Sequence, residues 1–280
     1  MTAVKVYVSV DMEGIAGVNH PHPTNAGHER YPAAVELMIG EANAAVEGAL
    51  AAGATDILVN DSHGGMYNLL PAALHPAARV LQGQKAWSMV EGAGPDAGFD
   101  VALFVGYHAR AGHGRGTIAH TYSLAPVETR LDGRPTGEYG LNAMILGAWG
   151  IPVGLVTGDD ALADEVAEWL PWAERVVVKT AAGGNAAASV HPTVAADRIR
   201  QGAEGAVRAA RVGGRLELLR VGPPVVIEVD YSRGVEADHA AIVPGGERVG
   251  DRGVRFASDD PATAYRGFLA GNRLASIVDR

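Results

Sequence analysis

Short runs of valine, isoleucine and leucine alternate with helix-like segments through the first 180 residues, and this alternation constrains the fold most. Residues 4–10 place valines at every second position, between Lys5, Tyr7 and Ser9, which is the period of a β-strand. Further strands are predicted at 57–59, 79–81, 101–105, 153–156 and 176–179, and helices at 31–52, from Glu138 onward and at 161–169. This order predicts an α/β fold with a mostly parallel sheet and flanking helices.

The pattern changes after about residue 180. A long helix is predicted over 192–212, a strand over 225–229 and a closing helix over 262–278, with a glycine-rich charged stretch between the last two. We therefore expect two domains, an α/β domain over residues 1–180 and a smaller α+β domain over residues 181–280. Inside the first domain, Asp132-Gly133 predicts a two-residue hairpin turn.

Composition excludes several classes of function. The chain has 280 residues, of which 48% are hydrophobic and 20% charged, so a substantial core is available. A formal net charge of -9 disfavours nucleic acid and anionic membranes as partners. There is no cysteine, so a metal site must use His, Asp, Glu or water. No signal peptide and no membrane span is evident, and we expect a cytoplasmic protein.

Polar clusters follow four of the predicted strands. They are Asp11 with Glu13, Asp61 with His63, His108, and Asp159 with Asp160. Ligands of open α/β sheets bind beyond the carboxyl ends of the strands, so residues far apart in sequence are expected to meet there. Asp11 and Glu13 are two residues apart and can point to the same side, where they repel each other unless a proton or cation lies between them. Carboxylates and imidazoles together suit zinc or another divalent first-row metal.

Each of these residues also has a structural interpretation. Asp11 is suited to capping a turn, Asp61 to capping a loop or holding a ligating histidine, and one of Asp159 and Asp160 to capping a helix. Glu138 is suited to a helix N-terminus, where the macrodipole favours a carboxylate. His120 follows a glycine-rich loop and is either a core histidine or a catalytic group. We interpret the histidines at positions 20, 22 and 28 as part of a flexible surface loop.

Several segments resemble, in order, those of the DppA-like D-aminopeptidase family of zinc metallopeptidases. The most specific is SVDMEG at residues 9–14, followed by NDSH at 60–63, GYHAR at 106–110 and GEYGLNA at 137–143. Residues 88–92 and 158–160 are also similar to family segments. The resemblance covers most of residues 4–180 and is weaker beyond.

The resemblance implies a site with two zinc ions per subunit, or another divalent first-row metal. It implies that Asp11 bridges the ions, that Glu13 and His108 complete one, and that His63 and Glu138 complete the other. His120 matches the family's catalytic histidine. The implied activity is hydrolysis of short peptides, with N-terminal D-amino acids. The implied partner is a second copy of the chain in a homo-oligomeric ring such as a decamer.

The expected chemistry is hydrolysis by a metal-activated water. His120 would be either a nucleophile or an acid–base group, and we favour the acid–base role because a metal-bound hydroxide already supplies a nucleophile. A metal or a carboxylate such as Glu13 or Asp159 would hold the substrate amine. The alternatives are a two-metal hydrolase of another amide or of a phosphoester, and a non-catalytic metal-binding oligomer. A phosphoesterase would need cationic side chains near the ligands, and only Arg110 and Arg115 are close in sequence.

Overall fold

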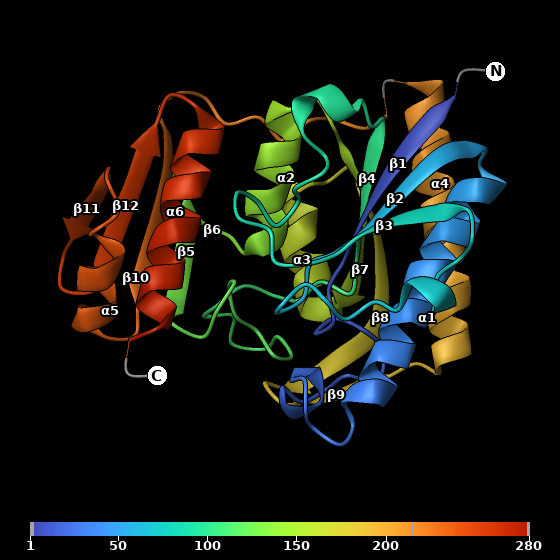
Figure 1. Ribbon diagram of the computed structural model, residues 1–280, viewed down its shortest axis with the longest axis horizontal. Helices are drawn as coiled ribbons and strands as arrows, with labels where there is room; N and C mark the ends of the chain where they lie inside the picture. Colours follow the sequence, from blue (N-terminus) through green and yellow to red (C-terminus); the bar gives the residue numbers. More distant parts are fainter. Residues whose placement is uncertain (1–2, 214, 279–280) are drawn as a thin grey trace.

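The larger of two sheets forms the centre of the protein. The computed structural model describes residues 3–213 and 215–278, and within them this sheet has seven strands in the order β3-β2-β1-β4-β7-β8-β9 (Figure 1). All neighbouring pairs are parallel except β8 with β9. The strands are β1 (Val4–Val10), β2 (Ala54–Asp61), β3 (Ala78–Leu81), β4 (Val101–Val105), β7 (Val153–Asp159), β8 (Glu174–Gly183) and β9 (Ala186–Ser189). The expected mostly parallel α/β architecture is confirmed.

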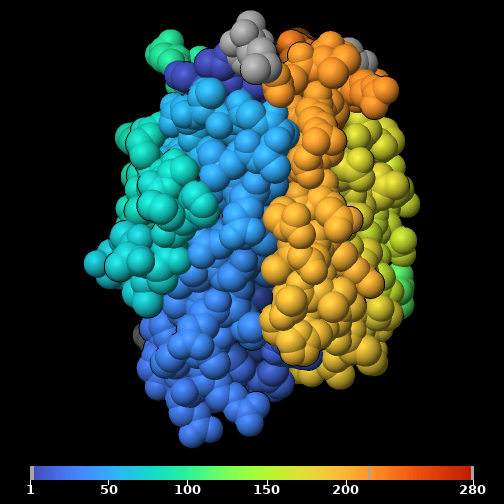
Figure 2. All heavy atoms as spheres, turned by 90° about the vertical axis from the view of Figure 1, so that its right-hand side faces the viewer, coloured from blue at the N-terminus to red at the C-terminus, as the bar shows by residue number. Residues whose placement is uncertain are grey.

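Helices cover both faces of this sheet. The side chains of β1 point alternately to one face and to the other, and most of them are apolar, so both faces need to be covered. The valines at every second position, from Val4 to Val10, pack under α1 (Tyr31–Ala51) and α4 (Pro192–Val212). These two helices lie side by side over one face (Figure 2). Tyr7 points to the other face, where α2 (Glu138–Ala148) and α3 (Asp160–Trp169) pack. Both faces are therefore buried, as the apolar composition of β4 and β7 predicts.

The second sheet is antiparallel and has five strands in the described residues, in the order β11-β12-β10-β5-β6. The strands are β5 (Pro126–Leu131), β6 (Arg134–Pro135), β10 (Val225–Tyr231), β11 (Gly246–Val249) and β12 (Gly253–Ser258). The hairpin between β5 and β6 turns at Asp132 and Gly133, with φ values of 49° and 76°, as two-residue hairpin turns require. Helices α5 (Gly234–Ala240) and α6 (Pro261–Ser276) cover this sheet, and α6 also contacts α2 (Figure 1).

The two sheets are interleaved in sequence. The β5–β6 hairpin comes from the middle of the chain but pairs with β10, and α4 follows residue 180 but packs on the larger sheet. A division of the chain into two domains at residue 181 stays a prediction. With that boundary, the β5–β6 hairpin of the first segment belongs to the second sheet, and α4 of the second segment packs on the first sheet. Strands β9, β11 and β12 and helix α5 lie in segments whose polar, glycine-rich sequence gave no clear period. Short 3-10 helices at His22–Thr24, Pro71–Ala73 and Pro95–Ala97 complete the described elements.

No helix in the described part of the chain combines the length and apolar character that crossing a bilayer requires. The cytoplasmic location expected from the sequence stays a prediction.

Candidate metal centre

The site residues gather where the strand order of the larger sheet reverses. β1 and β4 are neighbours, and the connections that follow them run to opposite sides of the sheet. The segments after both strands touch: the Gly14 N–H donates to the Gly106 carbonyl at 2.7 Å. A Cβ on Gly14 would lie 1.8 Å from the Tyr107 carbonyl oxygen, so only glycine allows this approach. Asp11 and Glu13 are thereby brought beside His108.

One group of side chains consists of Asp11, Glu13 and His63. His63 follows β2, and its Nδ1 lies 2.9 Å from Glu13 Oε2 and 3.3 Å from Asp11 Oδ1. Its Nε2–H donates to the Thr24 carbonyl at 2.9 Å, because a carbonyl oxygen can only accept. That bond leaves the lone pair of Nδ1 facing the two carboxylates, which is the arrangement of a metal-ligating histidine.

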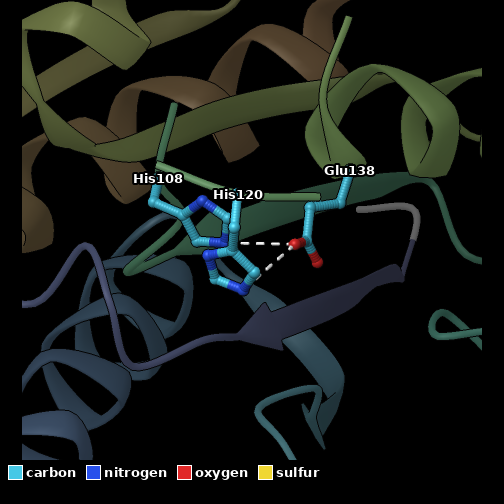
Figure 3. Close-up of side chains that lie close together, drawn as sticks. All are labelled: His108, His120 and Glu138. Carbon is cyan, nitrogen blue, oxygen red and sulfur yellow. Dashed lines mark ion pairs between the residues drawn. The ribbon is translucent and has the colours of Figure 1, made fainter. Parts of the chain in front are cut away.

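The second group consists of His108, His120 and Glu138 (Figure 3). His108 Nδ1–H donates to the Ala109 carbonyl at 2.9 Å, so the Nε2 lone pair faces the carboxylates. This Nε2 lies 3.1 Å from Glu138 Oε1 and 3.4 Å from Asp11 Oδ2. Asp11 therefore directs one oxygen to each group and joins them into one centre.

His120 lies against His108, with the two imidazole rings stacked (Figure 3). Its Nδ1–H donates to the Ile118 carbonyl at 2.9 Å, and its Nε2 lies 3.8 Å from Glu138 Oε1. Ile118 and Tyr122, two residues before and after it, both have left-handed backbones, with φ values of 54° and 58°. Non-glycine residues adopt this conformation only where their surroundings impose it, at a cost of about 1–3 kcal/mol each. The segment around His120 is therefore held in a specific conformation.

Burial and neighbouring charges shift the pKa values of the centre in the absence of a cation. Burial raises the pKa of Asp11 to about 7, and the Glu13 carboxylate adds to this rise. Burial also opposes ionisation of Glu13, but His63 outweighs it and holds the Glu13 pKa well below its usual value. Burial alone would lower the histidine pKa values, but the carboxylates raise that of His63 well above normal and that of His108 to about 10. The cation-free centre thus takes up protons at both histidines near neutral pH.

The donor set fits divalent metal ions. Three carboxylates and three imidazole nitrogens, from two groups with metal-ligand spacing, point to one buried region. His108 Nε2 is buried and forms no hydrogen bond within the described residues, although Glu138 Oε1 is close. A lone pair and a carboxylate oxygen facing each other need a proton or a cation between them. The assignment of ligands to individual ions stays a prediction; here Glu13 is nearest His63, and Glu138 is nearest His108.

A cleft of about 670 Å³ opens over the centre. Its floor contains Asp11, Glu13, His63, His120 and Glu138, and one wall comes from the loop at residues 21–26. The opposite wall comes from the helices of the second sheet, with Arg233, Glu236, Leu269, Asn272 and Arg273 among its residues. Clefts of this volume hold small ligands. The larger sheet therefore positions the metal-binding floor of the cleft, and the helices of the second sheet contribute one of its walls.

Other residues singled out from the sequence have structural positions. Asp159 caps α3 through the Leu162 N–H, and its second oxygen accepts from the Thr117 N–H, so it does not face the cleft. Asp160 pairs with Arg115. Asp61 accepts from the backbone of residues 68 and 69 and orders the turn after His63.

The loop histidines at positions 20, 22 and 28 contact one another, but no group of metal-ligand spacing in the described residues includes them. The loop nevertheless contributes the Thr24 carbonyl that orients His63. The Ala109 and Ile118 carbonyls act in the same way on the other two histidines. These three carbonyls could not be predicted from the sequence, because every residue has a backbone carbonyl and its type does not show which histidine it contacts.

Known proteins resemble this chain in both sequence and fold. The sequence pattern of the peptidase M55 family, described as D-aminopeptidase, matches residues 4–270. The chain belongs to the D-aminopeptidase family. A D-aminopeptidase of Bacillus subtilis (strain 168) is 35% identical over 276 residues, which are 97% of this chain and 98% of that protein.

A solved structure of the family has the same fold. It is described as the Zn-dependent D-aminopeptidase DppA from Bacillus subtilis, a self-compartmentalizing protease. It superposes with a TM-score of 0.93 at 33% identity, covering 99% of this chain and 100% of its own. Membership of the D-aminopeptidase family makes this protein a peptidase, a hydrolase of peptide bonds, as the sequence predicted.

Proposed function

We propose that this protein is a zinc aminopeptidase that hydrolyses short peptides with an N-terminal D-amino acid at a two-metal centre. The observation that carries the proposal is the position of Asp11, whose two oxygens face two separate ligand groups on the floor of one cleft. The zinc and the D-preference are supported by what the relatives are described as. The cleft volume, about 670 Å³, suits a peptide of a few residues.

Asp11, Glu13 and His63 would hold one metal, and His108 and Glu138, with Asp11, the other. This pairing is supported by the shorter distances and exchanges His63 and His108 relative to the pairing that the resemblance implies. Bound divalent ions at such a centre activate water and polarise a carbonyl. Within the described residues, no donor group of similar spacing exists apart from the two that form this centre. A peptide in the cleft would therefore meet its metals at this centre.

His120 is proposed to move the proton of the reaction. Burial and then the neighbouring His108 lower the pKa of His120, so its ring is neutral at neutral pH. The Ile118 carbonyl holds the proton on Nδ1. The lone pair is therefore on Nε2, which lies 3.8 Å from Glu138 Oε1. A neutral imidazole in this orientation accepts a proton at Nε2 and returns it to the departing amine.

The side chains of the cleft limit how a substrate amine is held. Asp159, one of two carboxylates considered from the sequence, has both oxygens occupied by backbone N–H groups. The acidic residues that line the cleft are Asp11, Glu13, Glu138 and Glu236, and Glu236 is paired with Arg233. We assign the amine to the carboxylates of the centre or to a bound metal.

The phosphoesterase alternative gains no support from the arginines near the ligands. Arg110 pairs with Glu165, and Arg115 pairs with Asp160 and Asp164. Both are already neutralised, and neither lines the cleft. The two arginines that do line the cleft are also engaged, since Arg233 pairs with Glu236 and Arg273 donates to the carbonyls of Lys85 and Ala86.

We also propose that the chain forms a ring-shaped homo-oligomer such as a decamer. A relative is described as self-compartmentalizing. Next to the cleft, two large apolar side chains are exposed, Leu124 at 81% and Tyr67 at 77%. Burial of these two side chains between subunits would remove apolar surface from water. Light scattering behind a sizing column measures the assembly, and a monomer at micromolar concentration would contradict it.

A single assay tests the proposed activity. Release of free amino acid is followed from matched D- and L-dipeptides, with chelator and after zinc is restored. We expect the D-dipeptide to be cleaved faster, the chelator to abolish cleavage and zinc to restore it. Equal rates on both stereoisomers would contradict the D-preference, and a chelator-resistant rate would contradict the metal centre.

A further inference from the structure

Two charged side chains outside the metal centre are buried beneath the segment that carries Glu13. We call residues 13–18 the Glu13 loop. Lys179 on β8 is 1% exposed, and Glu41 on α1 is 4% exposed. Neither lines the cleft. A buried charge is costly unless it is hydrogen-bonded, so both must have a structural reason to be there.

Lys179 directs its ammonium at the backbone of the Glu13 loop. Nζ donates to the carbonyl of Glu13 itself, to that of Ile15 at 3.3 Å and to that of Val18. Three acceptors match the three N–H bonds of an ammonium group. From α1, Glu41 Oε1 accepts from the Ala16 N–H at 2.8 Å. The loop is therefore fixed by hydrogen bonds from two separate elements, and those from the Lys179 ammonium are charge-assisted.

The strand order shows why such an anchor is needed. β1 and β8 are separated by β4 and β7 in the sheet. The Glu13 loop leaves β1 and reaches a side chain of β8, so it crosses the ends of the strands between them. Its carbonyls turn inward, where water cannot solvate them. Lys179 meets them at the far end of that crossing.

We propose that Lys179 is a positioning residue for Glu13. By bonding the Glu13 carbonyl and two more in the same loop, it fixes the backbone from which the Glu13 carboxylate reaches His63. It contacts neither the carboxylate nor the cleft, so it acts through the loop alone. This inference rests on the proposed function, because it takes Glu13 as a metal ligand.

The test compares zinc binding in variants of the full-length protein. Lys179→Met keeps the approximate shape and removes all three donors, whereas Lys179→Gln keeps an amide that can satisfy part of the loop. The affinity for each of the two zinc ions per chain is measured by competition with a chelator. The kcat and KM of each variant are measured as well. Residues that hold metal ligands in place typically contribute about 10–100-fold to metal affinity or activity.

We expect one zinc equivalent to weaken by about 10–100-fold in Lys179→Met and by less in Lys179→Gln, while the other stays tight. The expected kinetic change is a fall in kcat at nearly constant KM. Glu41→Gln should bind zinc as the wild type does, because an amide oxygen still accepts from Ala16. The control is Val178→Ala, which removes apolar volume at a buried position of the same strand but takes away no hydrogen bond to the loop.

The outcomes separate the possible accounts. Wild-type zinc affinity in both Lys179 variants would overturn the inference and leave the proposed function standing. Equal weakening of both equivalents, or the same loss in Val178→Ala, would also overturn it, because a general loss of stability would explain the result. If Lys179→Met does not fold, Lys179→Gln against Val178→Ala decides by the same criteria. A wild-type protein that takes up no zinc would refute the proposed function, and this inference with it.

Discussion

His108 and His120 stack face to face, with their ring centroids 4.0 Å apart and an angle of 8° between the ring planes. Each ring donates its Nδ1–H to a backbone carbonyl and turns its Nε2 toward the Glu138 side of the centre. Two charged imidazoliums at this distance would repel each other. The stack therefore favours one ring as a ligand and the other as a neutral proton carrier.

Replacing His120 with alanine should separate catalysis from metal binding. The proposed ligands Asp11, Glu13, His63, His108 and Glu138 remain, so we expect bound zinc to be unchanged. Loss of a positioned acid–base group typically lowers the rate by about 10²–10⁴-fold. Elemental analysis and steady-state kinetics measure the two effects. His28→Ala, in the exposed loop, is the control, and full activity in His120→Ala would reject the assigned role.

Replacing Asp11 should remove metal and activity together. Its two oxygens serve both ligand groups, so Asp11→Ala takes a donor from each ion at once. We expect zinc content and peptidase activity to fall to background, with far-ultraviolet circular dichroism unchanged. A variant that retains its full complement of zinc would show that Asp11 does not join the groups.

Zinc binding should release protons. In the metal-free protein the pKa of His108 is raised to about 10, and that of His63 is raised well above normal, so both rings are protonated at neutral pH. A ligand nitrogen must be deprotonated, so the two histidines should release about two protons per chain. Asp11 should add a fraction of one more, because its pKa of about 7 leaves it part-protonated at neutral pH. Calorimetric titration in two buffers of different ionisation enthalpy counts them.

A matched pair of variants checks the origin of these protons. His108→Ala should lower the count by about one, because it removes a charged ring. His120→Ala should leave it unchanged, because the pKa of His120 is lowered by burial and by His108. Zinc binding without proton release would contradict the protonated resting centre.

The stabilisation that zinc provides should grow with pH. Without metal, the raised pKa of His108 contributes stability that is complete below its unfolded value near 6.5 and is lost as pH rises toward about 10. Asp11 acts in the same direction, since its pKa is raised from 3.8 to about 7 and its protonated form fits the folded protein better. Zinc competes with those protons, so its affinity rises over the same range.

Thermal unfolding measures this difference. The melting temperature with saturating zinc, minus that of the metal-free protein, should be larger at about pH 8 than at about pH 6. Asp11→Ala provides the control, because it should show no zinc-dependent shift at either pH. A shift that shrinks with rising pH would contradict the assigned protonation states.

The strand-end residues could be predicted because the information is local. The valine alternation of β1 and the apolar runs of β2 and β4 identify buried strands, and parallel strands place their following residues at one edge. His63 and His108 therefore lie beside Asp11 as expected. The grouping of side chains around each histidine could not be predicted, because it depends on rotamers set by tertiary packing.

Contacts between distant segments were hidden for a related reason. The pairing of β5 with β10 joins residues about a hundred positions apart, and the sequence of neither strand identifies the other as its partner. Lys179 lies within β8, and its proposed role depends on three carbonyls more than 160 residues away in the sequence.

The central claim is that two ligand groups joined by Asp11 hold two zinc ions that make this protein a peptidase. Titration of zinc into metal-stripped protein, with cleavage of a D-dipeptide followed at each addition, tests it most directly. The account predicts binding that saturates at two equivalents per chain and activity that returns as the sites fill. Full activity without added metal, or saturation at one equivalent with full activity, would contradict it.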